Sequence, residues 1–198
     1  MIFGHEFALA TLDAAWPEWA LVIGCLAAIW VGAWILRPLA TLLHELGHAV
    51  PALLLTNEVV EVRVGRLSRE GSEYMVDAWR NLGRLHWVCS FRGGGDGFTG
   101  YDRDALNRWS LLAVIAGGPL ISGLACGLGA WLCFKTLEEP WQLLIASSFL
   151  CSNAILFLRS VIPVHLSGGD PSDGMDFWIT LRQTEQAAKE KPPNEMTL

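Results

Sequence analysis

The segment His44-Glu45-Leu46-Gly47-His48 contains the residues of this chain that are best suited to metal chemistry. Two histidines four residues apart lie on the same face of a helix, so both imidazoles can reach a single metal ion. Glu45 lies to the side of that face, close enough to take a proton from a water that the metal activates. The segment therefore predicts a zinc site for the hydrolysis of peptide bonds.

A catalytic zinc ion usually has three protein ligands, and the two histidines supply only two of them. The candidates for the third ligand are His165, Asp170 and Asp173, which all follow the last long apolar segment of the chain. Gly174 follows Asp173 and would let the backbone turn closely around a metal. Spacing alone leaves the choice among these three residues open.

The composition indicates an integral membrane protein with a single domain, residues 1–198. Of the 198 residues, 52% are hydrophobic and 17% are charged, whereas a soluble domain has about 25% charged residues. Several of the ten tryptophans stand at the ends of apolar segments, as in the aromatic belts of membrane proteins. No long basic run exists, which argues against nucleic-acid binding. The five cysteines form no CxxC pair, so a thiolate zinc site is not indicated.

Four apolar segments are long enough to cross a hydrocarbon core of about 30 Å. They are residues 20–36, 39–55, 111–134 and 141–164. Arg37-Pro38 separates the first two, and proline suits the first turn of a new helix. The HELGH segment lies inside the second one, where ionisable residues are costly and usually functional. A metal would remove that cost by binding the imidazoles and attracting the carboxylate to bound water.

Residues 56–108 are polar and predict a small β-hairpin or sheet at the membrane surface. Glu58–Val64 alternates polar with β-branched residues, as a half-exposed strand does, and Arg84–Phe91 is a second candidate strand. Gly93–Gly97 is expected to form a turn. The C-terminal tail, residues 175–198, predicts a short helix that frays. The fold class is therefore mainly α, a polytopic membrane protein with about four transmembrane helices and a small β element.

The distribution of positive charge predicts how the chain is oriented in the membrane. Four spans would put the N-terminus, the 56–108 loop and the C-terminal tail on one side. The loop carries eight arginines, whereas the opposite side has only Arg37 and Lys135. Because cytoplasmic segments are enriched in Lys and Arg, we expect a multi-pass protein with its long loop and both termini in the cytoplasm.

The order of four motifs resembles the site-2 protease family of intramembrane zinc metalloproteases. Members of that family have HExxH on one transmembrane helix and Asp-Gly on a later one, after a proline element. Between them lie a membrane-associated β segment and a helix with a Gly-Pro break. This chain has the HELGH segment followed by Gly118-Pro119-Leu120, Pro163 and Ser172-Asp173-Gly174, so the resemblance covers roughly Pro38–Phe177.

The resemblance implies an enzyme that hydrolyses peptide bonds in or near the transmembrane segments of other membrane proteins. By this resemblance Asp173 is the third Zn²⁺ ligand beside His44 and His48, and Glu45 is the catalytic base. The expected partners are membrane-protein substrates, the lipid bilayer and a regulatory membrane partner. The strand from Val59 to Val64 is a candidate to pair with an unwound substrate by edge addition, and a structural lid is the alternative.

Two positions depart from the family pattern. The family's Asn before the proline corresponds to Ser160, and an Asn that often follows the Gly-Pro break corresponds to Ser122. Such asparagines are suited to holding a substrate strand, so Ser160 and Ser122 are the predicted substrate-binding residues, with fewer donors and acceptors. The departures favour an alternative function, a catalytically weak or inactive membrane scaffold that binds client helices. A transporter is a further alternative, which the lack of an inverted repeat disfavours.

Overall fold

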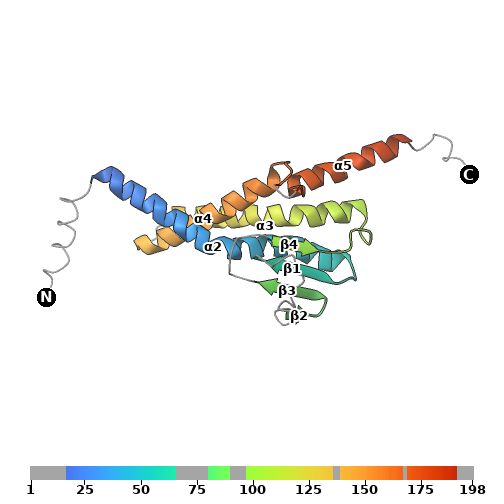
Figure 1. Ribbon diagram of the computed structural model, residues 1–198, viewed down its shortest axis with the longest axis horizontal. Coiled ribbons are helices and arrows are strands. Elements are labelled where there is room, and N and C mark those ends of the chain that lie inside the picture. The colour runs from blue at the N-terminus through green and yellow to red at the C-terminus, as the bar shows by residue number, and fades with distance from the viewer. Residues whose placement is uncertain (1–16, 66–79, 90–96, 136–138, 167–168, 191–198) are drawn as a thin grey trace, which may run out of the picture.

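The computed structural model describes residues 17–65, 80–89, 97–135, 139–166 and 169–190, the last eight of them by their backbone only. The described chain is mainly helical, as predicted. Its elements are α2 (Glu18–Leu55), β1 (Val60–Val64), β2 (Arg80–Leu82), β3 (Leu85–Cys89), β4 (Gly97–Gly100), α3 (Arg108–Phe134), α4 (Pro140–Val161) and α5 (Asp173–Glu190). In Figure 1, α2 begins at one end of the molecule and α5 finishes at the other, with the sheet beside the second half of α2.

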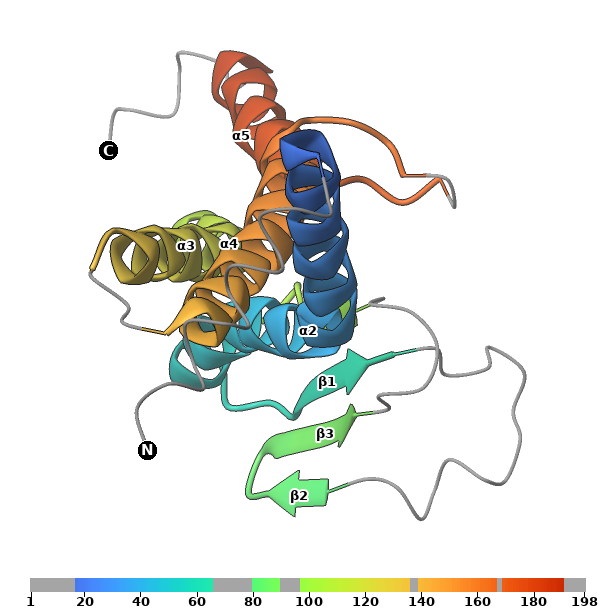
Figure 2. The ribbon, with the colours of Figure 1, turned by 90° about the vertical axis from the view of Figure 1, so that its left-hand side faces the viewer.

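Helix α2 is continuous over 38 residues and joins the two segments, 20–36 and 39–55, that were expected to be separate spans. Pro38 and Pro51 both lie inside it. Figure 2 shows that α2 bends between its dark-blue first half and its light-blue second half. A proline inside a helix removes one backbone hydrogen bond and bends the axis, and neighbouring helices compensate for the loss. The expected break at Arg37-Pro38 is therefore a bend and not a helix end.

In the described part of the chain, three helices rather than four are long and apolar enough to cross a membrane: α2, α3 and α4. The predicted spans 111–134 and 141–164 correspond to α3 and α4, although α4 ends at Val161. A helix of 38 residues is about 57 Å long, more than one crossing requires. If each of the three crosses once, the two ends of the chain lie on opposite sides. The expectation that both termini are cytoplasmic therefore loses its basis.

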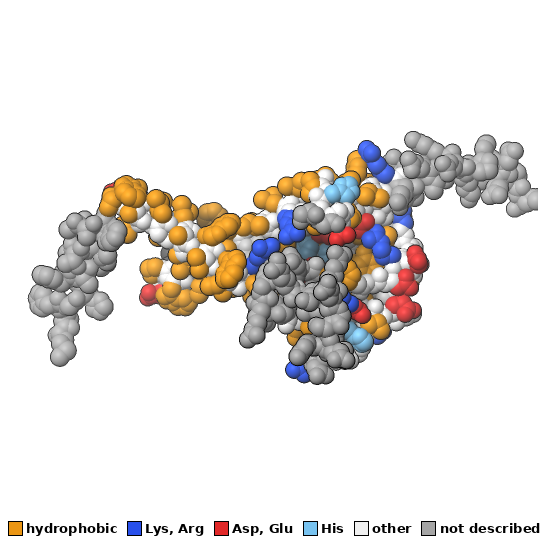
Figure 3. All heavy atoms as spheres, in the orientation of Figure 1, with side chains coloured by type: hydrophobic (Ala, Val, Ile, Leu, Met, Phe, Trp, Pro, Cys, Tyr) orange, Lys and Arg blue, Asp and Glu red, His pale blue; other side chains and the backbone are white. Residues whose placement is uncertain are grey.

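The surface divides into an apolar end and a mixed end. Figure 3 shows that hydrophobic side chains cover the left-hand end, whereas charged side chains gather toward the other. The apolar end contains the start of α2 and the adjoining ends of α3 and α4. Trp19, Phe134 and Trp141, at these ends of the three helices, are all more than half exposed. An apolar surface of this extent is suited to contact with lipid.

The polar segment forms a mixed four-stranded sheet in the order β2-β3-β1-β4. Strand β1 runs parallel to β3 and antiparallel to β4, and β2 forms a hairpin with β3 through a turn that contains Gly83 at φ +61°. The predicted small sheet and its two candidate strands are confirmed. Because β1 has a partner on each side, the expected edge addition at Val59–Val64 is wrong: in the described sheet, β2 and β4 are the edges.

Two other sequence predictions fall partly outside the described residues. The expected glycine turn at 93–97 lies outside them except for Gly97, which begins β4. The tail is helical to Glu190, further than the expected short helix, and residues 191–198 lie outside the described chain. Helix α5 begins at Asp173, one of the three candidates for the third metal ligand.

The sheet packs on the second half of α2 through alternate residues of β1. Val60, Val62 and Val64 have no exposed surface and belong to one cluster with Ala49 and Ala52 of α2. The alternation of polar and β-branched residues that predicted this strand matches the burial in the structure. Every second side chain of β1 faces the helix. Because the HELGH segment lies on the same half of α2, this core holds the sheet beside it.

We expect Val62→Ala to destabilise the fold by about 2 kcal/mol, because it removes buried methyl groups and leaves a cavity. Thermal unfolding in detergent, followed by near-ultraviolet circular dichroism, would measure the loss. Val59→Ala is the control, since Val59 is 46% exposed just before the strand. Equal effects of the two substitutions would contradict this account of the core.

Candidate metal centre

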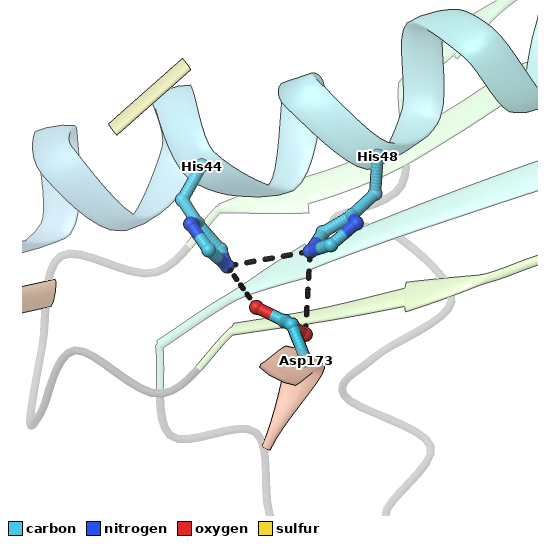
Figure 4. A group of neighbouring side chains, drawn as sticks. All are labelled: His44, His48 and Asp173. Carbon is cyan, nitrogen blue, oxygen red and sulfur yellow. Dashed lines mark hydrogen bonds and ion pairs between the residues drawn. The ribbon is translucent and has the colours of Figure 1, made fainter. Parts of the chain in front are cut away.

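Two imidazoles from α2 and one carboxylate from α5 converge at one point, as Figure 4 shows. The Nε2 atoms of His44 and His48 lie 3.3 Å apart. Asp173 Oδ2 is 3.0 Å from His44 Nε2, and Asp173 Oδ1 is 3.6 Å from His48 Nε2. The three side chains form a group that can hold a metal ion. The structure thus brings together both histidines of the HELGH segment and the acid that the family resemblance implied.

Each imidazole has a polar contact at Nδ1, the ring nitrogen that points away from Asp173. This contact holds the other ring nitrogen, Nε2, toward the point where the three side chains converge. His48 Nδ1 donates to the backbone carbonyl of Val114 at 2.8 Å, and because a carbonyl only accepts, this nitrogen carries the hydrogen. His44 Nδ1 lies 2.9 Å from the hydroxyl oxygen of Ser122. When His44 donates here too, both Nε2 lone pairs face the carboxylate of Asp173. Such a set of acceptors is stabilised by a metal ion, or by a proton, that lies among them.

Three glycines let α3 approach the face of α2 that carries His44 and His48. A Cβ on Gly47 would lie 2.5 Å from the carbonyl oxygen of Gly117, and a Cβ on Gly118 would collide with the imidazole of His48. The two backbones therefore touch beside the site, which brings the outer hydrogen-bond partners on α3 within reach of both histidines. Helix α3 continues through Pro119, so the expected Gly-Pro interruption is a close helix contact rather than a helix end.

Ser172 fixes Asp173 as the first residue of α5. The Ser172 hydroxyl oxygen accepts from the backbone N–H of Met175 at 3.2 Å, the usual contact of a helix N-cap. The same hydroxyl donates to the carbonyl of Ile162 at 2.7 Å, and the Ser172 N–H donates to the carbonyl of Val164 at 2.9 Å. These bonds tie the start of α5 to the chain just beyond α4, and so return Asp173 to the site.

Two further contacts hold the first turn of α5. Gly174 lies against the end of α4, where a Cβ would collide with the carbonyl of Val161. Asp176 forms a bidentate ion pair with Arg103, with N–O distances of 2.8 and 3.0 Å. Arg103 precedes α3, so the carboxylate of Asp173 is positioned by contacts from two directions.

Glu45 is buried beside the edge strand β4. Its Oε2 accepts from the hydroxyl of Thr99 at 2.6 Å, and the same hydroxyl lies 3.1 Å from the Glu45 carbonyl oxygen. Gly97 leaves the room for this carboxylate, since a Cβ there would collide with it. Sequence reasoning missed Thr99, because a threonine in a polar segment carries no distinguishing signal. Gly97 was part of the predicted glycine turn, but its contact with Glu45 arises only when the chain folds, so the sequence could not reveal it.

Electrostatics and exposure separate Asp173 from the other two candidate ligands. Burial raises the pKa of the Asp173 carboxyl, but when the imidazoles are protonated at Nε2, the hydrogen bonds and charges of His44 and His48 outweigh it and lower the pKa to about 2. Asp173 is therefore ionised at neutral pH, as a metal ligand must be. His165 and Asp170 are exposed and lie outside the group of converging donors, and the backbone of His165 pairs with that of Pro171.

The two predicted substrate-binding serines lie inside the protein. Ser122 has no exposed surface, and its hydroxyl contacts His44. Ser160 is 6% exposed and donates to the carbonyl of Phe157 in its own helix at 2.9 Å. Ser122 thus contributes to the orientation of a candidate ligand, a role that its position after the Gly-Pro pair did not reveal. A part in substrate binding stays a prediction for both serines.

An apolar groove of about 560 Å³ lies between α3, α4 and α5. Asp173 is the one acidic residue in its lining, and Leu120, Leu124 and Phe157 are among its walls. Leu120 and Leu124 are both more than 60% exposed. The groove therefore connects an ionised candidate ligand with an apolar surface.

Comparisons of the chain with models of known protein families, with curated proteins and with solved structures find no match. The resemblance to the site-2 proteases therefore stays a prediction from the HELGH segment and the Ser172-Asp173-Gly174 segment. The geometry around His44, His48 and Asp173 stands on its own.

We expect Asp173→Ala to reduce the metal content of the detergent-purified protein sharply, because it removes one of three converging donors. His165→Ala and Asp170→Ala are matched controls and should retain the metal of the natural chain. Inductively coupled plasma mass spectrometry of the four proteins would measure metal per chain. Loss of metal from His165→Ala, with retention in Asp173→Ala, would assign the third ligand to His165 instead.

Gly118→Ala should lower metal affinity although it removes no ligand, because the added methyl group displaces the imidazole of His48. Gly127→Ala is the control on the same helix, since a Cβ there meets nothing within 4 Å. Competition with a chromophoric chelator would compare the two affinities. Unchanged affinity in Gly118→Ala would mean that α3 does not constrain the site.

Proposed function

We propose that this chain is a zinc-dependent endopeptidase that cleaves other membrane proteins in or near their transmembrane segments. The observation that carries the proposal is the convergence of His44, His48 and Asp173 beside the buried carboxylate of Glu45. A structural cluster needs only to satisfy its own hydrogen bonds and charges. A metalloprotease needs, in addition, a buried carboxylate next to the metal ligands.

The donor set suits zinc. Imidazole nitrogen and carboxylate oxygen bind zinc at about 2.0–2.2 Å, so three tetrahedral ligands stand about 3.3–3.6 Å apart. Here the two Nε2 atoms are 3.3 Å apart, and with one ligand atom from each residue the three donors lie within 4.8 Å of one another. Three protein ligands leave one position for water or substrate, as catalytic sites require. When bound, zinc supplies Lewis acidity, which lowers the pKa of water and polarises a peptide carbonyl.

Glu45 is the proposed general base and acid. Its carboxylate takes a proton from the attacking water and then delivers a proton to the nitrogen of the leaving amine. Thr99 holds Oε2, which leaves Oε1 to exchange the proton. The outer hydrogen bonds to Val114 and Ser122 keep both imidazoles oriented while charge develops in the site.

Two features support an apolar, extended substrate. The groove between α3, α4 and α5 has hydrophobic walls and reaches Asp173, so it suits the side chains of a transmembrane segment. Strand β4 is an edge strand that contacts Glu45 through Thr99. A substrate strand that pairs with β4 would bring its backbone beside the carboxylate.

The proposed arrangement in the membrane is multi-pass, with α3, α4 and the first half of α2 as the crossings. These three helices carry the apolar surface of the molecule. The arginine-rich segment that forms the sheet lies on the cytoplasmic side by the positive-inside rule. A membrane-protein substrate would then reach the site from the bilayer, and a regulatory membrane partner could control that access.

We expect Glu45→Gln to abolish cleavage while metal content stays unchanged, because the amide cannot accept the proton but keeps its place beside Thr99. Cells that lack the protein would be complemented with the natural chain or with Glu45→Gln. Mass spectrometry of new N-termini in the membrane fraction would identify cleavage inside transmembrane segments. These termini should appear with the natural chain and disappear in the variant.

Glu18→Gln is the matched control, since Glu18 occupies the exposed first turn of the same helix, and it should leave the cleavage pattern intact. Identical N-termini with the natural chain and with Glu45→Gln would contradict the protease. If client proteins can be cross-linked equally to both and neither produces new termini, the scaffold function gains support instead.

A further inference from the structure

A second cavity, of about 140 Å³, lies between α2 and α4 and shares no residue with the metal centre or the apolar groove. Its two charged lining residues are Arg37 from α2 and Arg159 from α4, and no acidic residue lines it. This volume corresponds to about five molecules of liquid water. The cavity can therefore hold a small polar group such as a phosphate.

The polar groups of this cavity lack partners within the described chain. No hydrogen bond or ion pair of Arg37 or Arg159 is formed there, whereas Arg103 pairs with Asp176. Ser152 also lines the cavity, is 5% exposed, and has a buried hydroxyl with no hydrogen-bond partner among the described residues. Two guanidinium groups and an unused hydroxyl donor are what an oxyanion requires.

The two arginines lie at matching depths. Each stands 19 residues after the first residue of its helix, Glu18 in α2 and Pro140 in α4. That separation is a rise of about 29 Å, close to the thickness of the hydrocarbon core. Trp19 and Trp141 lie at the starts of α2 and α4, as tryptophans at one membrane interface do. Arg37 and Arg159 then lie at the level of the head groups on the other side of the membrane.

The cavity continues onto an apolar surface. Trp30, Trp34 and Ile155 line it and are 64%, 69% and 47% exposed. These side chains lie on the hydrocarbon side of the arginines, within two turns of them. A ligand with an anionic head and an apolar chain would therefore match the site at both ends.

We infer that this cleft binds an anionic phospholipid, with its phosphate between Arg37 and Arg159 and an acyl chain along Trp30 and Trp34. A zwitterionic lipid fits less well, because its ammonium group would meet two guanidinium groups and no carboxylate. The bound lipid would join α2 to α4 at Arg37, next to the first of the two prolines inside α2. The inference does not rest on metal binding or on proteolysis.

Native mass spectrometry of the full chain tests it, with protein released from nanodiscs of phosphatidylglycerol or of phosphatidylcholine. The natural protein should keep one phosphatidylglycerol molecule at activation energies that strip phosphatidylcholine. Thermal unfolding in detergent should shift upward by a few degrees with added phosphatidylglycerol. Equal retention of both lipids, or loss of both, would overturn the inference without the need for any variant.

Variants locate the site. Arg37→Gln and Arg159→Gln, singly and together, should weaken lipid retention, whereas Arg80→Gln with Arg182→Gln removes the same charge elsewhere and should not. Inorganic phosphate separates a lipid from a free anion: equal stabilisation by phosphate alone would show an adventitious ion only. Retention of phosphatidylglycerol in the folded double variant would place the lipid at another site and refute this one.

Discussion

Two imidazole lone pairs and a carboxylate repel one another in an apolar interior unless a metal ion or a proton lies among them. This constraint explains why so many contacts around the site serve to hold acceptors close together. Glycines at 47, 117 and 118 bring α2 and α3 into backbone contact, and the Val114 carbonyl then fixes the tautomer of His48. With neither a metal ion nor a proton at its centre, the candidate site would hold three acceptors that repel one another.

The two halves of helix α2 lie in different surroundings, and a bend separates them. The first half presents apolar side chains on all sides, as a helix in lipid does, and the second half is buried between the sheet and α3. A straight helix of this length could not both cross a bilayer and lie along the sheet. The prolines therefore allow one helix to place the HELGH segment at the edge of the apolar region, next to a polar sheet that supplies Thr99.

The sequence could predict those parts of the structure in which residue types repeat at the spacing of a helix or a strand. The four-residue spacing of His44 and His48 gives their common face, and the alternation of Val60, Val62 and Val64 gives a half-buried strand. Pro38 misled the prediction, because a proline in a membrane helix can end the helix or lie inside a continuous one, as it does in α2. The central position of β1 and the contact between Thr99 and Glu45 are long-range, and no local pattern carries them.

Asp173 follows His44 by 129 residues and opens the helix after the last apolar one. During synthesis the two histidines thus emerge long before their carboxylate partner. A chain still on the ribosome has two donors, too few to hold a catalytic zinc ion firmly. The order of residues along the chain therefore delays the candidate centre: its three donors can converge only after the start of α5 has been synthesised.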